Sequence, residues 1–223
     1  MPDRRQPTSP RRTLTVRGRG VASADPDLAI LTVGVVGRDP FYSAAVEDLN
    51  RRVEALRSDL EAVGVERARL KSTGFDVDDH RRYDSDSGEY VFLGYEAPHG
   101  LRLELPLEKE LLNNVLGRVA GSASEASVKV SLDVSDRKGL RRRAMRAAVE
   151  DAQKSAQVLV EASGATLGEM MSLDYSFVEI RTRTFSYGYR KPGPLTEAAA
   201  SAPDVEPEAL DAEEGVTIVW EIS

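Results

Sequence analysis

The amino-acid sequence predicts an α+β fold: a ferredoxin-like split βαββαβ core with an antiparallel sheet, extended by a third helix and C-terminal strands. Two observations lead to this prediction. Between residues 28 and 134, strand-like and helix-like apolar patterns follow one another in the order strand, helix, strand, strand, helix, strand. A longer helical pattern and further strand-like stretches come after that core. No boundary is evident, so residues 12–223 are expected to form a single domain.

The chain begins with a polar segment and then alternates as strands. Residues 1–11 contain three prolines and no apolar pattern, and they are expected to be a disordered tail. Residues 14–20 are predicted to be a strand, residues 25–27 (Asp-Pro-Asp) a turn, and residues 28–37 a strongly apolar strand.

The first helix has the clearest pattern in the sequence. Asp39 is predicted to be its N-cap, with Pro40 at the first helical position, and Gly64 is predicted to end it. The apolar residues recur every three or four positions and should form one buried stripe: Ala45, Leu49, Val53, Leu56, Leu60 and Val63.

A hairpin and a second helix complete the predicted core. Residues 68–79 and 89–107 alternate as strands, and the charged stretch 79–88 is expected to be the loop between them. Pro106 is predicted to open the second helix, which should end at Gly121. Its inward-facing residues are expected to be Leu111, Leu112, Val115, Leu116 and Val119.

The third helix is predicted over residues 137–163, with Asp136 as its N-cap and Gly164 after it. Its small-residue face suits close packing within the monomer, and a subunit contact is the alternative. The residues of that face are Leu140, Ala144, Ala147, Ala148, Ala152, Ala156, Leu159 and Ala162. The basic residues expected on its solvated side are Arg141, Arg142, Arg143 and Arg146.

The C-terminal part is predicted to contain three strands and one long loop. Residues 126–135, before the third helix, are predicted to be the last strand of the core. After that helix, residues 170–180 and 181–189 are predicted to be the first two C-terminal strands. Residues 192–214 are acidic and rich in proline and alanine, so we expect a mobile surface loop whose ends pair at neighbouring sheet positions. Residues 216–223 are predicted to be the last strand.

The composition excludes several classes of protein. The formal net charge of −7 argues against nucleic acid as a partner, and the absence of cysteine excludes disulfides and thiol chemistry. No stretch approaches the ~20 apolar residues of a membrane helix. The N-terminal residues lack the apolar part of a signal peptide, so a cytoplasmic protein is expected.

No established chemical motif is found. Gly18 and Gly20 lack the third glycine and the following helix of a dinucleotide site, so we interpret them as strand glycines that admit another backbone closely. The Asp-rich stretch 76–80 matches no calcium loop and is expected to be a solvated acidic loop. No G-x-S-x-G elbow occurs. We therefore predict no catalytic, cofactor-binding or metal-binding residue, and no cofactor.

One group of residues supports an alternative function. Tyr83, Tyr90, Tyr95 and Asp76 gather around the predicted hairpin and would be the contributors to a small-molecule site or a hydrolase with an unrecognised carboxylate site. Cross-strand packing of the tyrosines is the other interpretation. A deep pocket with two convergent buried carboxylates would favour the alternative function.

Several stretches together resemble the SIMPL domain family, formerly a domain of unknown function. They are "VRGRGVASADPDLAIL", "AAVEDLNRRVEALRSDLEAVGV", "STGFDV", "GYEA", "VSD" and "AMRAAVEDAQKSAQVLVEASGATLG", and they cover about residues 13–175. The resemblance implies an α+β, non-catalytic protein that forms large assemblies. Bacterial relatives are mostly periplasmic or envelope proteins linked to oxidative stress, so that localisation is the alternative to the cytoplasm. We therefore expect a self-assembling, non-enzymatic interaction scaffold with a possible protein partner.

Overall fold

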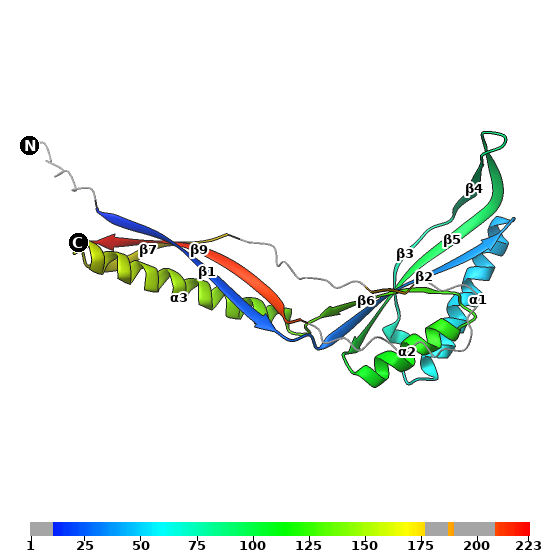
Figure 1. The fold of residues 1–223 in the computed structure, drawn as a ribbon, viewed down its shortest axis with the longest axis horizontal. Helices are drawn as coiled ribbons and strands as arrows, with labels where there is room; N and C mark the ends of the chain where they lie inside the picture. The colour runs from blue at the N-terminus through cyan, green and yellow to red at the C-terminus, as the bar shows by residue number, and fades with distance from the viewer. Residues whose placement is uncertain (1–10, 177–186, 190–207) are drawn as a thin grey trace, which may run out of the picture. The chain divides into compact units, whose positions relative to one another are not determined.

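A computed structural model describes residues 11–176, 187–189 and 208–223, which form two compact units (Figure 1). Among these residues, the first unit contains 11–25, 136–176 and 209–223, and the second contains the rest. Each unit carries its own antiparallel sheet with helices, so the predicted α+β class is confirmed.

The second unit has the predicted ferredoxin-like arrangement. Its sheet has the strand order β3-β5-β2-β6-β8, and β4 pairs with β5. The β6-β2-β5-β3 part is the order of a split βαβ sheet, and α1 and α2 pack together on the sheet (Figure 1). The bounds are β2 Leu28–Asp39, α1 Tyr42–Glu61, η1 Arg67–Arg69, β3 Lys71–Phe75, β4 Asp78–Asp84, β5 Glu89–Pro106, α2 Lys109–Gly121, β6 Ser127–Asp133 and β8 Tyr187–Tyr189.

Large aliphatic side chains fill the core of the second unit. Alternate residues of β2 and β5 face the helices, and the apolar stripe of α1 packs against them as predicted. Val115 and Val119 of α2 close the same core. The fully buried leucines of this core include Leu31, Leu49, Leu56, Leu101, Leu103 and Leu105.

Both helices of the second unit begin later than predicted. α1 starts at Tyr42, because β2 continues to Asp39, which pairs with Tyr95 of β5. The Asp39 carboxylate accepts a hydrogen bond from the Phe41 amide at 2.9 Å, so it caps a turn before the helix. Pro106 ends β5 rather than opening α2. In each case strand pairing with a distant segment outweighs the local capping signal.

The hairpin loop is also shorter than predicted. Residues 79–84 of the expected loop belong to β4, which pairs with β5, and the turn is confined to residues 85–88. Gly88 has a φ of 74°, the left-handed conformation that suits glycine in a tight turn.

A side-chain clasp joins the two ends of the continuous segment 26–135. The Asp27 carboxylate accepts hydrogen bonds from the Ser135 amide and the Ser135 hydroxyl, both at 2.6 Å. These two hydrogen bonds, the hydroxyl one first, lower the pKa of Asp27. The two ends of the segment 26–135 therefore lie side by side.

The first unit is a three-stranded sheet with one long helix on one face. The strand order is β1-β9-β7, and all pairs are antiparallel. The predicted helix ends are confirmed: the Asp136 carboxylate accepts from the Gly139 amide, and Gly164 adopts the left-handed conformation after the last turn. The bounds are β1 Thr13–Ala24, α3 Arg137–Ser163, β7 Leu167–Ser176 and β9 Leu210–Ile222.

The C-terminal strands do not extend the core sheet in the way that was expected. β7 and β9 pair in the sheet of the first unit, and only the short β8 joins the sheet of the second. β8 and β9, on either side of the predicted loop 192–214, thus lie in different sheets, and the expectation of neighbouring sheet positions is wrong. The single-domain prediction for 12–223 stays a prediction, since compactness does not test independent folding.

The last strand begins earlier than predicted. β9 starts at Leu210, inside the stretch 192–214 that was expected to be a loop. Leu210, Ala212 and Glu214 are fully or almost fully buried, and they continue the alternation of the later apolar residues. The acidic composition of this stretch favoured a loop in the sequence analysis, so the alternation of buried residues was not recognised. Residues 192–207 of the predicted loop and residues 1–10 of the predicted tail lie outside the described residues.

Close packing of α3 on β1 accounts for two glycines. A side chain at Gly18 would overlap the carbonyl oxygen of Ala148, and one at Gly20 would overlap that of Ala144. The alanines of α3 that face the sheet are completely buried. The prediction that the glycines admit another backbone is confirmed. Most of the predicted small-residue face packs within the monomer, but Leu159 and Ala162 are exposed, and Val160 is buried in their place.

Candidate interaction surfaces

An aromatic surface runs along one face of the β4–β5 hairpin, and we call it the aromatic stripe. It consists of Tyr42, Tyr83, Tyr90, Phe92 and Tyr95. The ring centroids are 5.3 Å apart for Tyr83 and Tyr90, 5.4 Å for Phe92 and Tyr95, and 5.7 Å for Tyr42 and Tyr95. Tyr90 remains 70% exposed and Phe92 49% exposed, so these rings are packed edge to face yet open to solvent.

A bulge at Gly94 aligns the stripe. β4 and β5 change register between His80 and Arg81, opposite the segment from Phe92 to Gly94. Gly94 has a φ of 129°, and a side chain there would meet the backbone at Asp39. The extra residue brings Tyr95 onto the face of Phe92, although the two are three positions apart.

The residues of the predicted small-molecule site separate into two groups. Tyr83 and Tyr90 are directly opposite each other on paired strands, which confirms the cross-strand interpretation for them. Tyr95 belongs to the same stripe, but Asp76 does not: its carboxylate accepts a hydrogen bond from the Val77 amide at 2.8 Å. The sequence analysis did not include Tyr42 and Phe92, because their exposure becomes evident only in the structure.

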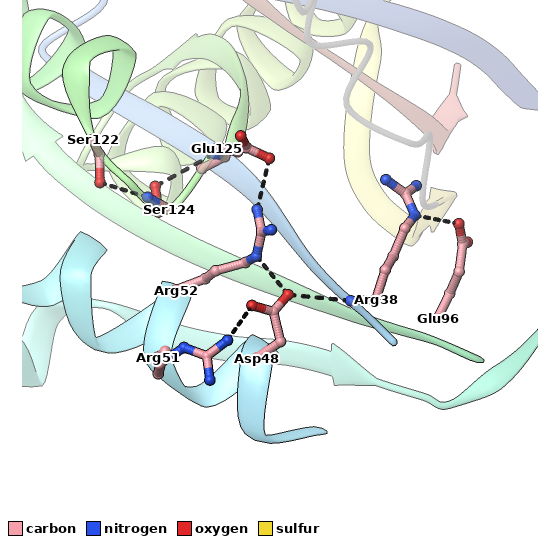
Figure 2. Close-up of polar contacts among 9 residues, drawn as sticks. Arg38, Asp48, Arg51, Arg52, Glu96, Ser122, Ser124 and Glu125 are labelled. Atoms are coloured by element: carbon pink, nitrogen blue, oxygen red, sulfur yellow. Dashed lines mark hydrogen bonds and ion pairs between the residues drawn. The ribbon is translucent and has the colours of Figure 1, made fainter. Parts of the chain in front are cut away.

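Polar side chains near the base of the hairpin form a network of ion pairs (Figure 2). The Asp48 carboxylate accepts hydrogen bonds from the Arg38 amide at 3.2 Å, from Arg51 at 2.7 Å and from Arg52 at 2.7 Å. Burial opposes ionisation of Asp48, but these donors outweigh it and lower the pKa of Asp48. Arg52 also pairs with Glu125 at 2.7 Å. The network ties α1 to β2 and to the segment after α2.

A second group joins the hairpin to β2. The Glu96 carboxylate lies 2.6 Å from Arg38 Nε and 2.7 Å from His80 Nδ1. His80 therefore contacts Glu96 rather than the aspartates of the stretch 76–80. No group of three or more metal-ligating side chains is arranged to hold an ion in the part of the chain that the structure describes.

A serine and a histidine meet on neighbouring strands. His99 Nε2 lies 2.8 Å from Ser72 Oγ, and burial, followed by the nearby Arg57 charge, lowers the pKa of His99. Among the described residues, no carboxylate is hydrogen-bonded to His99. The pair thus lacks the group that orients the imidazole in a catalytic triad.

The first unit contains a buried carboxylate. Glu214 is completely buried, and its oxygens accept from Arg141 Nε at 2.6 Å and from the Tyr175 hydroxyl at 2.8 Å. Arg141 also donates to the Tyr175 oxygen at 2.5 Å. Arg141 was expected on the solvated side of α3. It instead neutralises Glu214, because the early start of β9 places that carboxylate under the helix.

The two edges of the three-stranded sheet differ. At the β1 edge, α3 covers the backbone: the Asp151 carboxylate accepts from the Arg19 amide at 2.9 Å, and Arg143 donates to the Ser23 carbonyl at 3.3 Å. Among the described residues, β7 pairs with β9 alone, so its outer edge has no strand beside it. Met170 is 57% exposed and Leu173 44% exposed along that edge.

The SIMPL family model, described as a protein of unknown function (DUF541), matches residues 14–220. The chain belongs to the SIMPL family. The match begins in β1 and ends in β9, so the SIMPL region includes nearly all of both described sheets. This confirms the family that the sequence motifs indicated. None of the curated proteins compared with the chain matches it.

The described helices of this SIMPL chain include none that is long and apolar enough to cross a membrane. The ion pairs described above join acids to bases. Exposed large apolar side chains gather at the aromatic stripe and at the β7 edge, and others, such as Phe75 and Val158, lie elsewhere in the described residues. A shallow open depression on α3, lined by Met145, Arg146, Val149 and Glu150, adds apolar surface in the first unit. Such surfaces are suited to binding other chains.

Proposed function

We propose that this protein is a non-enzymatic, self-assembling interaction scaffold in which a second copy binds at the free edge of β7. The observation that carries the proposal is the contrast between the two edges of one sheet. Proteins commonly protect exposed strand edges against pairing. The β1 edge is protected by Asp151 and Arg143, whereas the β7 edge has no strand beside it among the described residues and presents apolar side chains.

The apolar side chains of β7 lie on the face that α3 covers elsewhere. Leu173 is directly opposite Ile218, and Met170 is opposite Trp220, both of which are buried on that face. α3 packs on β1 and β9 and barely reaches β7. Arg141 of α3 borders the uncovered part of this face, because its guanidinium donates a hydrogen bond to the hydroxyl oxygen of Tyr175 in β7. A second sheet added at the edge would cover this surface.

Two copies of β7 can pair antiparallel about the point between Met171 and Ser172. This register places Met170 opposite Leu173 on the helix-covered face of both copies. It also places Glu169 opposite Asp174, and like charges across a strand pair oppose association. We therefore expect self-association that strengthens with salt, because salt screens this repulsion.

The non-enzymatic part of the proposal is supported by the described polar groups. The cations of the network in Figure 2 each have a carboxylate partner, and Ser72 and His99 lack an orienting carboxylate. The alternative function, a hydrolase or small-molecule site, required convergent buried carboxylates near the hairpin. Of the two buried carboxylates described, Glu214 lies in the other unit, and Asp133 pairs with Leu28 at the end of β2 that is away from the hairpin. The stress-related role rests on the family resemblance alone.

Light scattering on the full chain at micromolar concentration tests the proposal. We expect oligomers, and a strict monomer across this range and at high salt would contradict it. Leu173→Lys should shift the population to monomer, since a charge would be buried in the new interface. Val158→Lys, at an exposed apolar position of α3, is the matched control and should leave the oligomer unchanged.

A charge reversal tests the register. Asp174→Lys would replace the repulsion with Glu169 by an attraction, so it should tighten self-association and reverse its dependence on salt. If the variant associates as the unmodified chain does, β7 edges do not pair about this point.

A further inference from the structure

We propose that Met170, at the outer edge of β7, is a site of oxidation by hydroperoxides, and that its sulfoxide weakens the pairing of β7 with a second copy. The effect on pairing rests on the proposed function, whereas the oxidation site does not. The inference comes from where the described sulfur atoms lie: two neighbouring exposed methionines occupy the middle of a strand that has no further strand beside it among the described residues.

Methionine holds all of the sulfur in this chain. The sequence contains four methionines and no cysteine, so a peroxide meets no thiol that would react first. Met170 is 57% exposed and Met171 46% exposed, whereas Met145 on α3 is only partly exposed. Met1 lies outside the described residues. Because a peroxide must reach the sulfur atom, oxidation of the described methionines should fall first on β7.

The strand pairing of β7 is irregular at these methionines. Its register with β9 shifts between Leu167 and Met170, and again between Met170 and Ser172. Such irregularities re-aim side chains at sheet edges. Met170 is the strand partner of Trp220, which is buried on the face that α3 covers elsewhere. The thioether therefore lies beside the apolar part of the first unit and is still open to solvent.

The reaction adds one oxygen atom to the thioether. A lone pair of the sulfur attacks the outer oxygen of the hydroperoxide, an S–O bond forms, and the O–O bond breaks. The proton passes to the leaving oxygen, which departs as water or as an alcohol. The sulfur is oxidised and the hydroperoxide is reduced, so no other reactant is needed. The product is a polar sulfoxide in place of an apolar side chain.

The sulfoxide would lie where the proposed β7 pair is apolar. In the register described above, Met170 of each copy is opposite Leu173 of the other, so a two-fold interface buries the modified residue twice. A sulfoxide oxygen buried there without a donor loses its hydrogen bonds to water. Pairing and oxidation therefore oppose each other: the sulfoxide weakens the pair, and the pair shields the thioether from the peroxide.

Peptide mass spectrometry after a short exposure to hydrogen peroxide tests the site. Leu173→Lys is used for this measurement, because it is expected to keep β7 unpaired. Digestion after glutamate releases Met145 in one peptide and Met170 with Met171 in another, and fragment ions separate the last two. We expect Met170 to be oxidised roughly threefold or more faster than Met145. Equal rates would overturn the assignment of the site.

Trp220 gives a second signal of the same reaction. It is the only tryptophan of the chain and the strand partner of Met170. Tryptophan emission responds to polar groups nearby, so it should change at the rate at which the Met170 sulfoxide appears. Met170→Leu should abolish this change, whereas Met145→Leu should retain it. An emission change that persists in Met170→Leu would mean that another residue reacts.

Light scattering on the unmodified chain tests the effect on association. Peroxide should weaken self-association about tenfold or more, because each interface buries two sulfoxides. Met170→Leu conserves volume and apolar character, so it should associate normally and resist peroxide. Met145→Leu is the matched control and should remain sensitive to peroxide. Met170→Gln introduces an uncharged polar side chain and should weaken association without any peroxide.

Failure of this proposal is distinguishable from failure of the β7 pair. Oligomers that persist after complete oxidation of Met170 would overturn the effect on pairing, and Leu173→Lys would still decide whether β7 forms the interface. A chain that is monomeric before peroxide is added would contradict the proposed function and the effect on pairing, and the mass spectra would still decide the site. Shielding gives the last check: Met170 should react more slowly in the unmodified oligomer than in Leu173→Lys, with Met145 equal in both. Equal Met170 rates in the two proteins would mean that pairing does not cover this residue.

Discussion

The two long helices rest on their sheets in opposite ways. α3 meets β1 through alanines and glycines, so that backbone lies directly against backbone, whereas α1 meets β2 and β5 through leucines and valines. In the first arrangement side-chain volume is almost absent from the contact. In the second, it fills the space. One chain thus contains two kinds of helix–sheet packing. The position of α3 is limited by the lack of room for larger side chains, and α1 is held by the burial of large apolar side chains.

The largest expected effect is at the glycines of β1. Gly18→Ala and Gly20→Ala should each lower the free energy of unfolding by about 3 kcal/mol or more, because the new methyl group would overlap helix backbone that cannot move aside. Urea unfolding followed by circular dichroism measures the loss. Gly117→Ala, in open space within α2, is the control and should stabilise by up to about 1 kcal/mol. Equal effects at both positions would refute steric exclusion.

Next in size is a truncation in the aliphatic core. Leu103→Ala should cost about 3 kcal/mol of unfolding free energy, because it leaves a cavity under α1 and α2. Leu103→Met conserves volume and should cost less than about 1.5 kcal/mol. Thermal unfolding of the two variants side by side gives the comparison. If Met proves as costly as Ala, this core depends on shape as strictly as the α3 contact does.

The ion pair under α3 should give a smaller effect. Arg141→Ala leaves Glu214 buried with only the Tyr175 hydroxyl as a described partner, so this variant should be measurably less stable than the unmodified chain. Arg142→Ala, at an exposed position beside it, should change stability by less than ~0.5 kcal/mol. Chemical denaturation at pH 7 separates these outcomes, and similar losses would mean that the pair contributes little.

The smallest effect concerns pH. Because burial lowers the pKa of His99 in the folded state, the unfolded chain binds that proton more readily. The stability from neutral His99 is therefore present above about pH 6.5, its unfolded value, and is lost as the pH falls through the lower folded value. His99→Gln should reduce proton uptake on unfolding by up to one proton in this window. An unchanged slope of unfolding free energy against pH would contradict the assignment.

Several features that depend on neighbouring residues alone were predicted correctly from the sequence. The apolar stripe of α1, the Asp136 cap and the Gly164 terminator depend on neighbours within a few residues, and all are present. Gly18 and Gly20 were also interpreted correctly, since the absence of a following helix left close backbone approach as their purpose.

Features that depend on distant pairing could not be predicted in this way. Asp39 and Pro106 carry good helix-start signals, yet the long β2–β5 ladder holds both in strands. Glu214 looks like a loop residue until β9 pairs with β1 and brings Arg141 above it. The aromatic stripe was half predicted, because alternation located its strands but not the exposure of Phe92.

The pairing of β1 with β9 has a consequence for the order in which the protein is made. Thr13 pairs with Glu221 and Ala24 with Leu210, so the first strand of the chain has its partner in the last. The segment 26–135, by contrast, is continuous and can close on itself as soon as it leaves the ribosome. At ~5–20 residues per second, roughly 4–15 s separate the synthesis of Ser135 from that of Leu210. During that interval the glycine-containing strand β1 lacks its strand partner β9, and the rate of translation sets the delay.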